Sequence, residues 1–255
     1  MTDNTPNLLS DQQMADYRQK GHLTTNRIFD SQTIDTAIRE SEDWQQAFLA
    51  DIDQAEETYF LEQEVAEPTL RKLDQPVYER AHFRRMASHP VLVGCVEQLI
   101  GIGVSVYFSQ IFCKAPNGSA AKPVHQDNFY FDPDNKDGLI TAWVALDDAT
   151  VDNGCLFFAE GTHLGPVYPH VATADQPFNL QMPPDIAQQY PMSPAPVDSG
   201  SVSFHHGSIF HQSSANQSPN WRRAVAFHYL HHQARCVAPN LTYDPSKIVK
   251  ITDPS

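Results

Sequence analysis

The period of the hydrophobic pattern changes near residue 103, and this change constrains the fold more than any other feature of the chain. Before it, apolar residues recur at helical spacing, most clearly at Leu92, Val96 and Leu99. After it, from Val104 and Val106 onward, apolar and polar residues alternate as in a half-buried strand. Helices followed by strands predict a β-sandwich or jelly roll with a helical layer on one outer face.

Capping and turn signals predict the individual elements. Ser10 and Ser31 stand where the first two helices should begin, and Gly21 and Gly101 stand where the first and third should end. The expected helices cover about 11–20, 31–52 and 90–100. The expected strands are 22–24, one from 104 onward, 139–146, 155–159, 200–205 and 222–231. Residues 59–80 show no clear pattern.

The length of 255 residues suits one β-rich domain, with a helix-rich N-terminal support (1–102), a jelly-roll catalytic core (103–235) and a C-terminal tail (236–255). A net charge of −14 without a Lys or Arg cluster argues against nucleic acid as a partner. No apolar stretch is long enough to cross a bilayer, and no secretory signal is recognisable, so we expect a cytoplasmic protein that does not bind membranes. The four cysteines form no C-x-x-C pair and are expected to be reduced.

The most informative short motif is His125-Gln126-Asp127. If the motif lies on one strand, His125 and Asp127 point the same way and can bind one ion. His211, from a distant strand, would supply a third ligand. Two imidazoles and one carboxylate on one face of an ion leave its other face open, which suits ferrous iron that must also bind a cosubstrate and dioxygen. Because the chain has twelve histidines, the motif gains its weight from its surroundings.

Several motifs follow one another along the chain. They are His125-Gln126-Asp127-Asn128, the strand 140–149, Asn153-Gly154-Cys155-Leu156, Glu160-Gly161-Thr162-His163, and a run from Gly200-Ser201-Val202 through His211-Gln212-Ser213 to Arg222-Arg223-Ala224. In this order they resemble the phytanoyl-CoA dioxygenase family, over roughly residues 8 to 232 and most specifically from Tyr107 onward. The resemblance implies an all-β core with flanking helices, a double-stranded β-helix of the cupin-like jelly-roll type. It also implies Fe(II) as metal and 2-oxoglutarate and dioxygen as cosubstrates.

The resemblance implies that His125, Asp127 and His211 are the metal ligands and catalytic residues. The 2-oxo acid end of 2-oxoglutarate would take two further positions on the metal, and dioxygen the last. His211 is preferred to His205 and His206 because it alone is followed by the serine, asparagine and arginine of the family pattern.

The far carboxylate of 2-oxoglutarate would be buried and needs a permanent cation. Arg222 matches the family's arginine for this role, because a guanidinium stays protonated and holds a carboxylate through two hydrogen bonds. Arg223 should face the opposite side of the strand and is the alternative. The matching Ser213 would donate a further hydrogen bond.

Other residues are weaker candidates for binding the cosubstrate. Trp143 matches a position that lines the cosubstrate pocket, and its alternative role is plain core packing. Gln110 and Lys114, on the strand before the motif, are expected to contact cosubstrate or substrate unless they are simply polar strand residues.

The substrate mouth is expected after the metal motif. Residues 128–131 would line it or form an aromatic packing cluster, and Asp132, Asp134 and Asp137 would make it acidic, which disfavours acyl-CoA substrates. The loop 165–197, with eight prolines, would border the mouth as a lid or be a surface loop stiffened by proline.

The resemblance implies an oxygenase that converts 2-oxoglutarate to succinate and carbon dioxide while hydroxylating an unactivated C–H bond of a small metabolite. Asp127 favours hydroxylation, because halogenases that resemble this family carry a small residue in its place. The alternative is a non-catalytic metal-binding β-sandwich that senses or stores a ligand. The sequence selects neither the substrate nor the oligomeric state.

Overall fold

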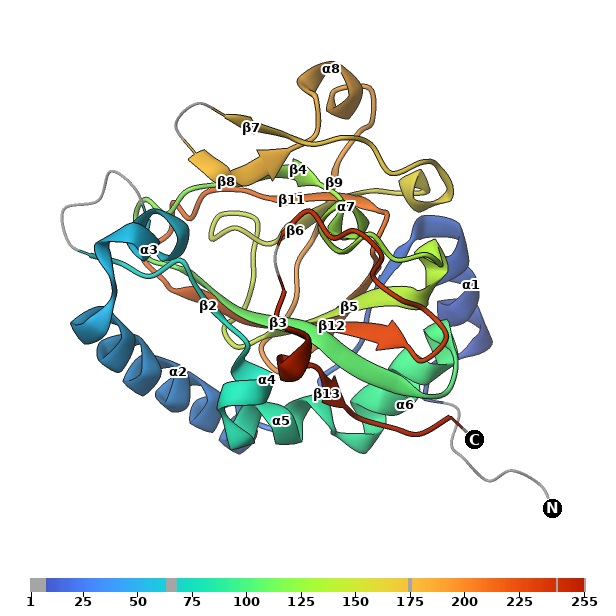
Figure 1. The fold of residues 1–255 in the computed structure, drawn as a ribbon, viewed down its shortest axis with the longest axis horizontal. Coiled ribbons are helices and arrows are strands. Elements are labelled where there is room, and N and C mark those ends of the chain that lie inside the picture. The colour runs from blue at the N-terminus through green and yellow to red at the C-terminus, as the bar shows by residue number, and fades with distance from the viewer. Residues whose placement is uncertain (1–7, 63–67, 174–175, 242, 255) are drawn as a thin grey trace.

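The computed structural model describes residues 8–62, 68–173, 176–241 and 243–254 (Figure 1). Its α-helices are α1 (Asp11–Lys20), α2 (Ser31–Asp51), α3 (Gln54–Phe60), α4 (Pro76–Glu79), α5 (Ala81–Ala87), α6 (Pro90–Ile100), α7 (Asp127–Phe131) and α8 (Pro184–Ala187). Its strands are β1 (His22–Thr24), β2 (Lys72–Asp74), β3 (Val104–Lys114), β4 (Lys122–His125), β5 (Leu139–Ala145), β6 (Leu156–Ala159), β7 (Val171–Thr173), β8 (Gln176–Gln181), β9 (Ser193–Ala195), β10 (Val202–His206), β11 (Phe210–Ser213), β12 (Arg222–His231) and β13 (Val249–Lys250).

Two facing antiparallel sheets form the centre of the molecule. Among the described residues, the larger sheet has the order β1-β10-β5-β12-β3-β13 with β2 also paired to β3, and the smaller has the order β4-β11-β6-β9. Helices α2, α5 and α6 cover the outer face of the larger sheet, while β7, β8 and α8 lie beyond the smaller one (Figure 1). This is a cupin-like jelly roll with a helical layer, so the predicted fold class is confirmed.

Alternation along the central strands divides the core into two parts. Ile140, Ala142 and Val144 of β5 pack on the helical side in one cluster with Phe83 of α5 and Leu92 of α6. Burying a side chain such as Phe83 or Leu92 contributes about 1.5–3 kcal/mol. The intervening residues of β5 face the space between the two sheets, where a second cluster forms. The strands therefore present one apolar face to the helices and a separate face to the interior of the jelly roll.

The N-terminal helices begin and end largely as predicted. Ser10 and Gln13 form a reciprocal capping box, and Gly21 ends α1 with a φ of 86° that favours glycine. The prediction of Ser31 as the second cap is wrong. Asp30 is the N-cap instead, and its side chain accepts a 2.8 Å hydrogen bond from the backbone N–H of Thr33. A carboxylate one residue earlier fills this role and also favours the positive end of the helix dipole.

Two stretches without a clear sequence pattern contain regular elements. Residues 59–80 include β2, which pairs with the edge of β3, followed by α4. In its described part, the 165–197 loop contains the β7–β8 hairpin, α8 and β9, and β9 pairs with β6. The C-terminal tail contributes β13, which also pairs with β3.

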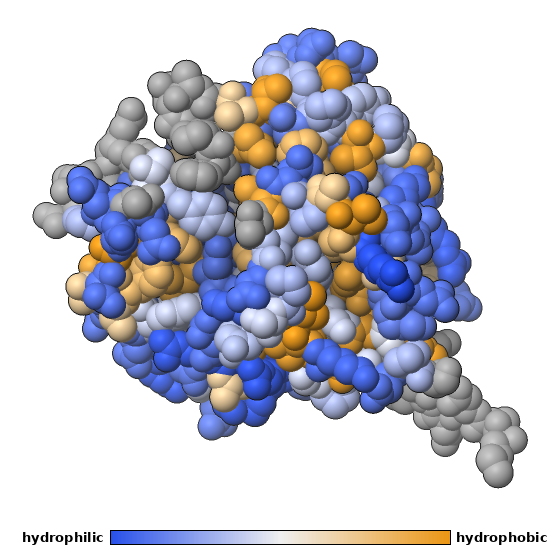
Figure 2. Space-filling model, viewed as in Figure 1, coloured by the Kyte–Doolittle hydropathy of each residue, from blue (hydrophilic) through white to orange (hydrophobic). Residues whose placement is uncertain are grey.

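The surface visible in one view is largely hydrophilic (Figure 2). Hydrophilic residues predominate on the face shown in Figure 2, with hydrophobic residues in smaller groups among them. Within the part of the chain that the structure describes, no helix is both long and apolar enough to span a bilayer.

Candidate active site

His125, Asp127 and His211 meet between the two sheets. His125 ends β4 and pairs directly with His211 of β11. Asp127 Oδ1 lies 3.8 Å from Nε2 of His125 and 3.6 Å from Nε2 of His211. All three side chains are buried, and one ligand atom from each lies within 4.8 Å of the others, which is close enough to hold a metal ion. The three candidate ligands therefore converge on one point.

The local structure of the motif differs from the prediction that both ends lie on one strand. β4 stops at His125, Gln126 is extended, and Asp127 is the first residue of the short helix α7. The extended backbone of Gln126 still directs both side chains inward. The Gln126 amide donates to the carbonyl oxygens of Ser208 and Pro166, at 2.8 and 3.1 Å, and so secures this turn from strand to helix.

Backbone carbonyl groups fix the tautomers of both histidines. Nδ1 of His125 lies 2.9 Å from the Pro123 carbonyl oxygen, and Nδ1 of His211 lies 3.1 Å from that of Ile209. Each Nδ1 must therefore carry the proton, which leaves a lone pair on Nε2 toward Asp127. Burial lowers the pKa of both imidazoles, that of His125 to well below its usual value. Both are neutral at pH 7, the form that binds metals.

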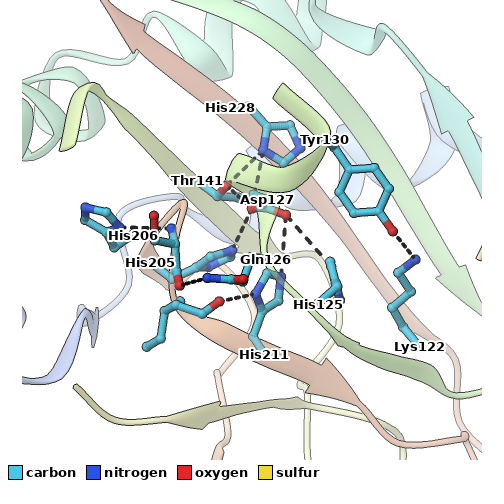
Figure 3. Close-up of polar contacts among 12 residues, drawn as sticks. Lys122, His125, Gln126, Asp127, Tyr130, Thr141, His205, His206, His211 and His228 are labelled. Carbon is cyan, nitrogen blue, oxygen red and sulfur yellow. Dashed lines mark hydrogen bonds and ion pairs between the residues drawn. The ribbon is translucent and has the colours of Figure 1, made fainter. Parts of the chain in front are cut away.

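The second carboxylate oxygen of Asp127 is held by the larger sheet (Figure 3). Thr141 donates a 2.6 Å hydrogen bond to Oδ2, and Nε2 of His205 lies 3.3 Å from the same atom. The Thr141 hydroxyl also lies 2.8 Å from Nδ1 of His228, and accepts from it because its own proton goes to Asp127. Burial alone would raise the pKa of Asp127, but His211 and the hydrogen bond from His205 hold it well below its usual value.

His205, Thr141 and His228 form one row across three neighbouring strands. Thr141 on β5 pairs with His205 on β10 and with His228 on β12. Neither Thr141 nor His228 is among the residues that the sequence predicts for the site, and His205 is only the less favoured alternative to His211. The alternation along each strand indicates which side chains point inward. The sequence does not indicate the register between the strands, which aligns these three side chains beneath Asp127.

Arg222 lies in the same cavity with an unsatisfied guanidinium. Its side chain is 3% exposed, and neither Nε nor Nη1 has a hydrogen-bond partner among the described residues. Its guanidinium carbon lies 5.6 Å from the centre of the Trp143 ring. Burial lowers the pKa of Arg222 to about 10, so the group stays charged at pH 7. A buried guanidinium with two nitrogens that find no partner among the described residues indicates a place for an anion.

The alternative arginine faces the opposite side of β12. Arg223 binds Asp147 through Nε at 2.8 Å and Nη2 at 2.9 Å, and also pairs with Glu42 of α2. Because its charge is already neutralised by two carboxylates outside the cavity, Arg223 is not available to a ligand between the sheets. The structure therefore favours Arg222 over Arg223.

The remaining candidates also line this cavity. Ser213 and Trp143 lie on its wall, as do Gln110 and Lys114. Gln110 donates a 2.7 Å hydrogen bond to Asp74, and the Lys114 ammonium donates to the carbonyl oxygen of Ala120. These placements agree with the expected positions, while the ligand that each residue contacts stays a prediction.

The predicted mouth requires a correction. Asp132, Asp134 and Asp137 do not line the cavity, and neither does any described residue of 165–197. Asp134 instead bonds the backbone of Arg235, and Asp137 pairs with His206. The lid interpretation of 165–197 thus gains no support. Besides the central strands and α7, the described residues of 59–72, 120–122 and 241–243 contribute to the cavity wall.

Aromatic residues after the metal motif divide between two roles. Phe129 stacks on His170 with ring centres 4.1 Å apart, so it packs as an aromatic cluster residue. Tyr130 and Phe131 line the cavity together with Phe108.

The fold and the site together define a class: jelly-roll proteins with a candidate metal site and a buried arginine between the two sheets. Comparison with known proteins identifies the family within this class. The family model of phytanoyl-CoA dioxygenase matches residues 5–224. The chain therefore belongs to the phytanoyl-CoA dioxygenase family, as the sequence resemblance predicted.

Individual relatives are distant. Rat peroxisomal phytanoyl-CoA dioxygenase is 27% identical over 161 residues, covering 61% of this chain and 48% of the relative, so the chain matches about half the length of that protein. The solved structure of SnoK, a non-heme alpha ketoglutarate dependent carbocyclase from nogalamycin biosynthesis, has a TM-score of 0.74 at 22% identity and covers 96% of this chain and 97% of its own. SnoN, an epimerase solved with Fe³⁺, alpha ketoglutarate and nogalamycin RO, has a TM-score of 0.68 at 24% identity and covers 92% and 91%. These likenesses show the fold.

Proposed function

We propose that this protein is an Fe(II)- and 2-oxoglutarate-dependent dioxygenase that hydroxylates an unactivated C–H bond of a small metabolite. One observation carries the proposal. The cavity that brings His125, Asp127 and His211 together also holds the guanidinium of Arg222, whose Nε and Nη1 have no hydrogen-bond partner in the described part of the chain. A metal that is only structural does not require a nearby arginine. A cosubstrate with two carboxylates requires both the metal, which binds its 2-oxo acid end, and the arginine, which binds its far carboxylate.

The donor set fits ferrous iron. His125 and His211 would each bind through Nε2, because Nδ1 is engaged with a backbone carbonyl group. Asp127 would bind through Oδ1 alone, because Oδ2 is held by Thr141 and His205. Two nitrogens and one oxygen are the ligand set of non-heme iron oxygenases with open positions. The chemistry that bound Fe(II) and 2-oxoglutarate supply is the activation of dioxygen, with release of succinate and carbon dioxide.

The surroundings fit 2-oxoglutarate. Arg222 would hold the far carboxylate through two charge-assisted hydrogen bonds, and Ser213 could add a third donor. Trp143 shields this end from water and keeps the guanidinium in place from the side. The family relationship and the alpha ketoglutarate in the solved SnoN complex support this assignment.

The chain's own contribution to the reaction is positioning. The aromatic wall of Phe108, Tyr130 and Phe131 offers an apolar surface beside the metal ligands, which orients a C–H bond and excludes water. Asp127, a carboxylate where halogenases have a small residue, favours hydroxylation. SnoK is named a carbocyclase and SnoN an epimerase. Product analysis must therefore distinguish hydroxylation from these other outcomes.

The test is an anaerobic titration of the protein with Fe(II) and then with 2-oxoglutarate. The visible charge-transfer band of the complex is the signal that is measured. The unchanged protein should develop the band. His125→Ala and His211→Ala should abolish it, together with succinate formation in air. His232→Ala is the matched control, because His232 is exposed and lies outside the cavity. Metal binding without any affinity for 2-oxoglutarate would refute the proposal and support a non-catalytic metal-binding protein instead.

A further inference from the structure

Among the described residues, the cavity wall carries more basic than acidic side chains, although the chain as a whole is acidic. The chain has a net charge of −14. The charged side chains described along the cavity wall are nevertheless mostly positive: Arg71, Lys72, Lys114, Lys122 and Arg222, against Glu62 and Asp127. The proposed ligands do not remove this excess, because the two charges of Fe(II) and the two of 2-oxoglutarate cancel. A separate group of cations therefore remains to be explained.

Three of these cations form a basic cluster, defined here as Arg71, Lys72 and Lys122. Nε and Nη2 of Arg71 donate to the Tyr59 carbonyl oxygen at 3.1 and 2.9 Å, which fixes the guanidinium against the end of α3. The Lys72 ammonium lies 3.1 Å from the centre of the Tyr59 ring. The Lys122 ammonium donates to the Tyr130 hydroxyl at 3.3 Å. The cluster thus consists of side chains from the start of β2 and from β4 that line the same cavity.

Holding these like charges together is unfavourable. Burial, together with the neighbouring charge of Arg71, lowers the pKa of Lys72 to about 7, and burial with the charges of Lys72 and Arg71 lowers that of Lys122 to about 7 as well. Among the described residues, no carboxylate lies within 4 Å of Arg71 or Lys72. The nearby Asp74 already accepts hydrogen bonds from Tyr59 and Gln110. A bound anion would relieve the repulsion and restore the charged form of both lysines.

The basic cluster is next to the metal ligands. Lys122 is three residues before His125 on β4, and both residues line the cavity. Tyr130, which Lys122 contacts, has its ring centre 5.9 Å from that of His125 (Figure 3). A molecule anchored at the basic cluster would therefore extend along the aromatic wall toward the metal.

We propose that the substrate carries an anionic group, a carboxylate or a phosphate, that binds to the basic cluster while its hydrocarbon part lies against Tyr130 and Phe131. This inference rests on the proposed function and names the substrate class of the same site. It reverses the expectation of an acidic mouth, because the aspartates that supported that expectation lie outside the cavity.

The test compares probes of one shape and different charge. The anaerobic protein, loaded with Fe(II) and 2-oxoglutarate, is titrated by calorimetry with 3-phenylpropionate, 2-phenylethyl phosphate, 3-phenylpropanol and 3-phenylpropylamine. At least one acid should bind about tenfold or more tightly than the alcohol, with the amine weakest, as expected for a charge-assisted contact. The acid that binds better identifies the anionic group as carboxylate or phosphate.

Variants assign the effect to the basic cluster. Lys122→Met should weaken the preferred acid about tenfold and leave the alcohol nearly unchanged, and Lys122→Arg should restore most of the affinity. Lys250→Met is the matched control, because Lys250 is 63% exposed on β13 and far from the cavity wall. Raising the salt concentration should weaken the acid more than the alcohol.

Several results would overturn the inference. They are equal affinity for acid, alcohol and amine, loss of affinity for every probe in Lys122→Met, or no measurable binding of either acid at millimolar concentration. Failure of the proposed function is distinct, because 2-oxoglutarate itself would then fail to bind before any probe is added.

Discussion

At the residue scale, the two oxygens of Asp127 have different tasks. Oδ1 faces the two histidines, and Oδ2 is engaged by Thr141 and His205. Because Oδ2 is held in this way, the carboxylate would bind a metal through Oδ1 alone. A coordination position that bidentate binding would occupy would then be available to another ligand. Residues that orient metal ligands typically affect metal affinity by about 10- to 100-fold.

We therefore predict that Thr141→Val weakens Fe(II) binding about tenfold, because valine keeps the shape but removes the hydroxyl that Asp127 accepts from. Thr141→Ser, which retains a hydroxyl, should recover most of the affinity. Anaerobic calorimetry measures both dissociation constants. An unchanged constant in Thr141→Val would show that the hydrogen bond does not position the carboxylate.

A second prediction concerns Arg222. Arg222→Gln keeps a hydrogen-bond donor but removes the charge, so the dissociation constant for 2-oxoglutarate should rise by roughly 30-fold or more while Fe(II) affinity changes little. Arg222→Lys should lie between, because an ammonium keeps the charge but loses the paired geometry. If 2-oxoglutarate binds Arg222→Gln as tightly as the unchanged protein, the arginine does not hold its carboxylate.

The sequence predicts candidate residues in two cases. They belong to motifs that follow one another in the family's order, or they lie on strands whose alternation shows which side chains share a face. His125, His211 and Arg222 belong to the motif order, and Arg222 is preferred to Arg223 because it matches the family's arginine, while strand parity places the two side chains on opposite faces. His205 is the less favoured alternative in the sequence because the serine, asparagine and arginine of the family pattern follow His211 alone, and a linear sequence does not state which residue of β5 His205 pairs with. Cross-strand register depends on turn geometry and packing of the whole sheet, so the row beneath Asp127 emerged only in three dimensions.

At the element scale, the close approach of α7 to the turn after β10 places Asp127. The Asn128 N–H donates to the Gly207 carbonyl oxygen at 2.7 Å, and the Asn128 amide donates to Ser208 and to Lys136. A Cβ on Gly207 would lie 2.0 Å from the Asn128 side-chain oxygen. Only glycine allows this contact, and the helix that begins with Asp127 depends on it.

Gly207→Ala should therefore lower the free energy of unfolding by about 1–3 kcal/mol, the usual cost of overpacking a buried contact. Urea denaturation measures this change. The effect should be smaller in an Asn128→Ala background, where the nearest colliding side chain is absent and only Leu139 Cδ2 at 2.9 Å remains close, so a double-mutant cycle should give a clear interaction energy. Additive effects would place the strain elsewhere.

Sequence patterns predicted elements whose signals are local. The capping box of α1, the glycine that ends it and the alternation of β12 are all short-range features, and these elements were predicted within a residue or two. β2 and β9 were missed because each is three residues long and exists through pairing with a longer strand. α7 was missed because its five residues carry an aromatic run typical of a strand, while the contact with Gly207 fixes a helical turn.

At the scale of the whole molecule, acidic and basic side chains are distributed unevenly. Acidic residues prevail overall, whereas the described cavity wall is mostly cationic. Several histidines are likewise removed from water and held as neutral groups. Burial lowers the pKa of His22, His170, His206 and His228 to about 4. The burial of these histidines has a consequence for stability.

A histidine whose pKa is 6.5 in the unfolded chain and about 4 in the folded protein binds its proton first in the unfolded state. Above pH 6.5 the histidine is neutral in both states and its protonation does not oppose folding. As the pH falls from 6.5 toward 4, only the unfolded state binds the proton, so the free energy of unfolding decreases. For the fully buried His228 the loss over this window is on the order of 3 kcal/mol.

We predict that the metal-free protein loses at least about 2 kcal/mol of unfolding free energy between pH 7 and pH 5, measured by urea denaturation in the presence of a chelator. His206→Gln should reduce the pH dependence, because glutamine can still donate to Asp137 but does not titrate. The exposed His232→Gln should leave it unchanged. A free energy of unfolding that stays constant from pH 7 to pH 5 would mean that the buried imidazoles accept protons in the folded state, and the neutral metal-binding forms assigned to His125 and His211 would then also be in doubt.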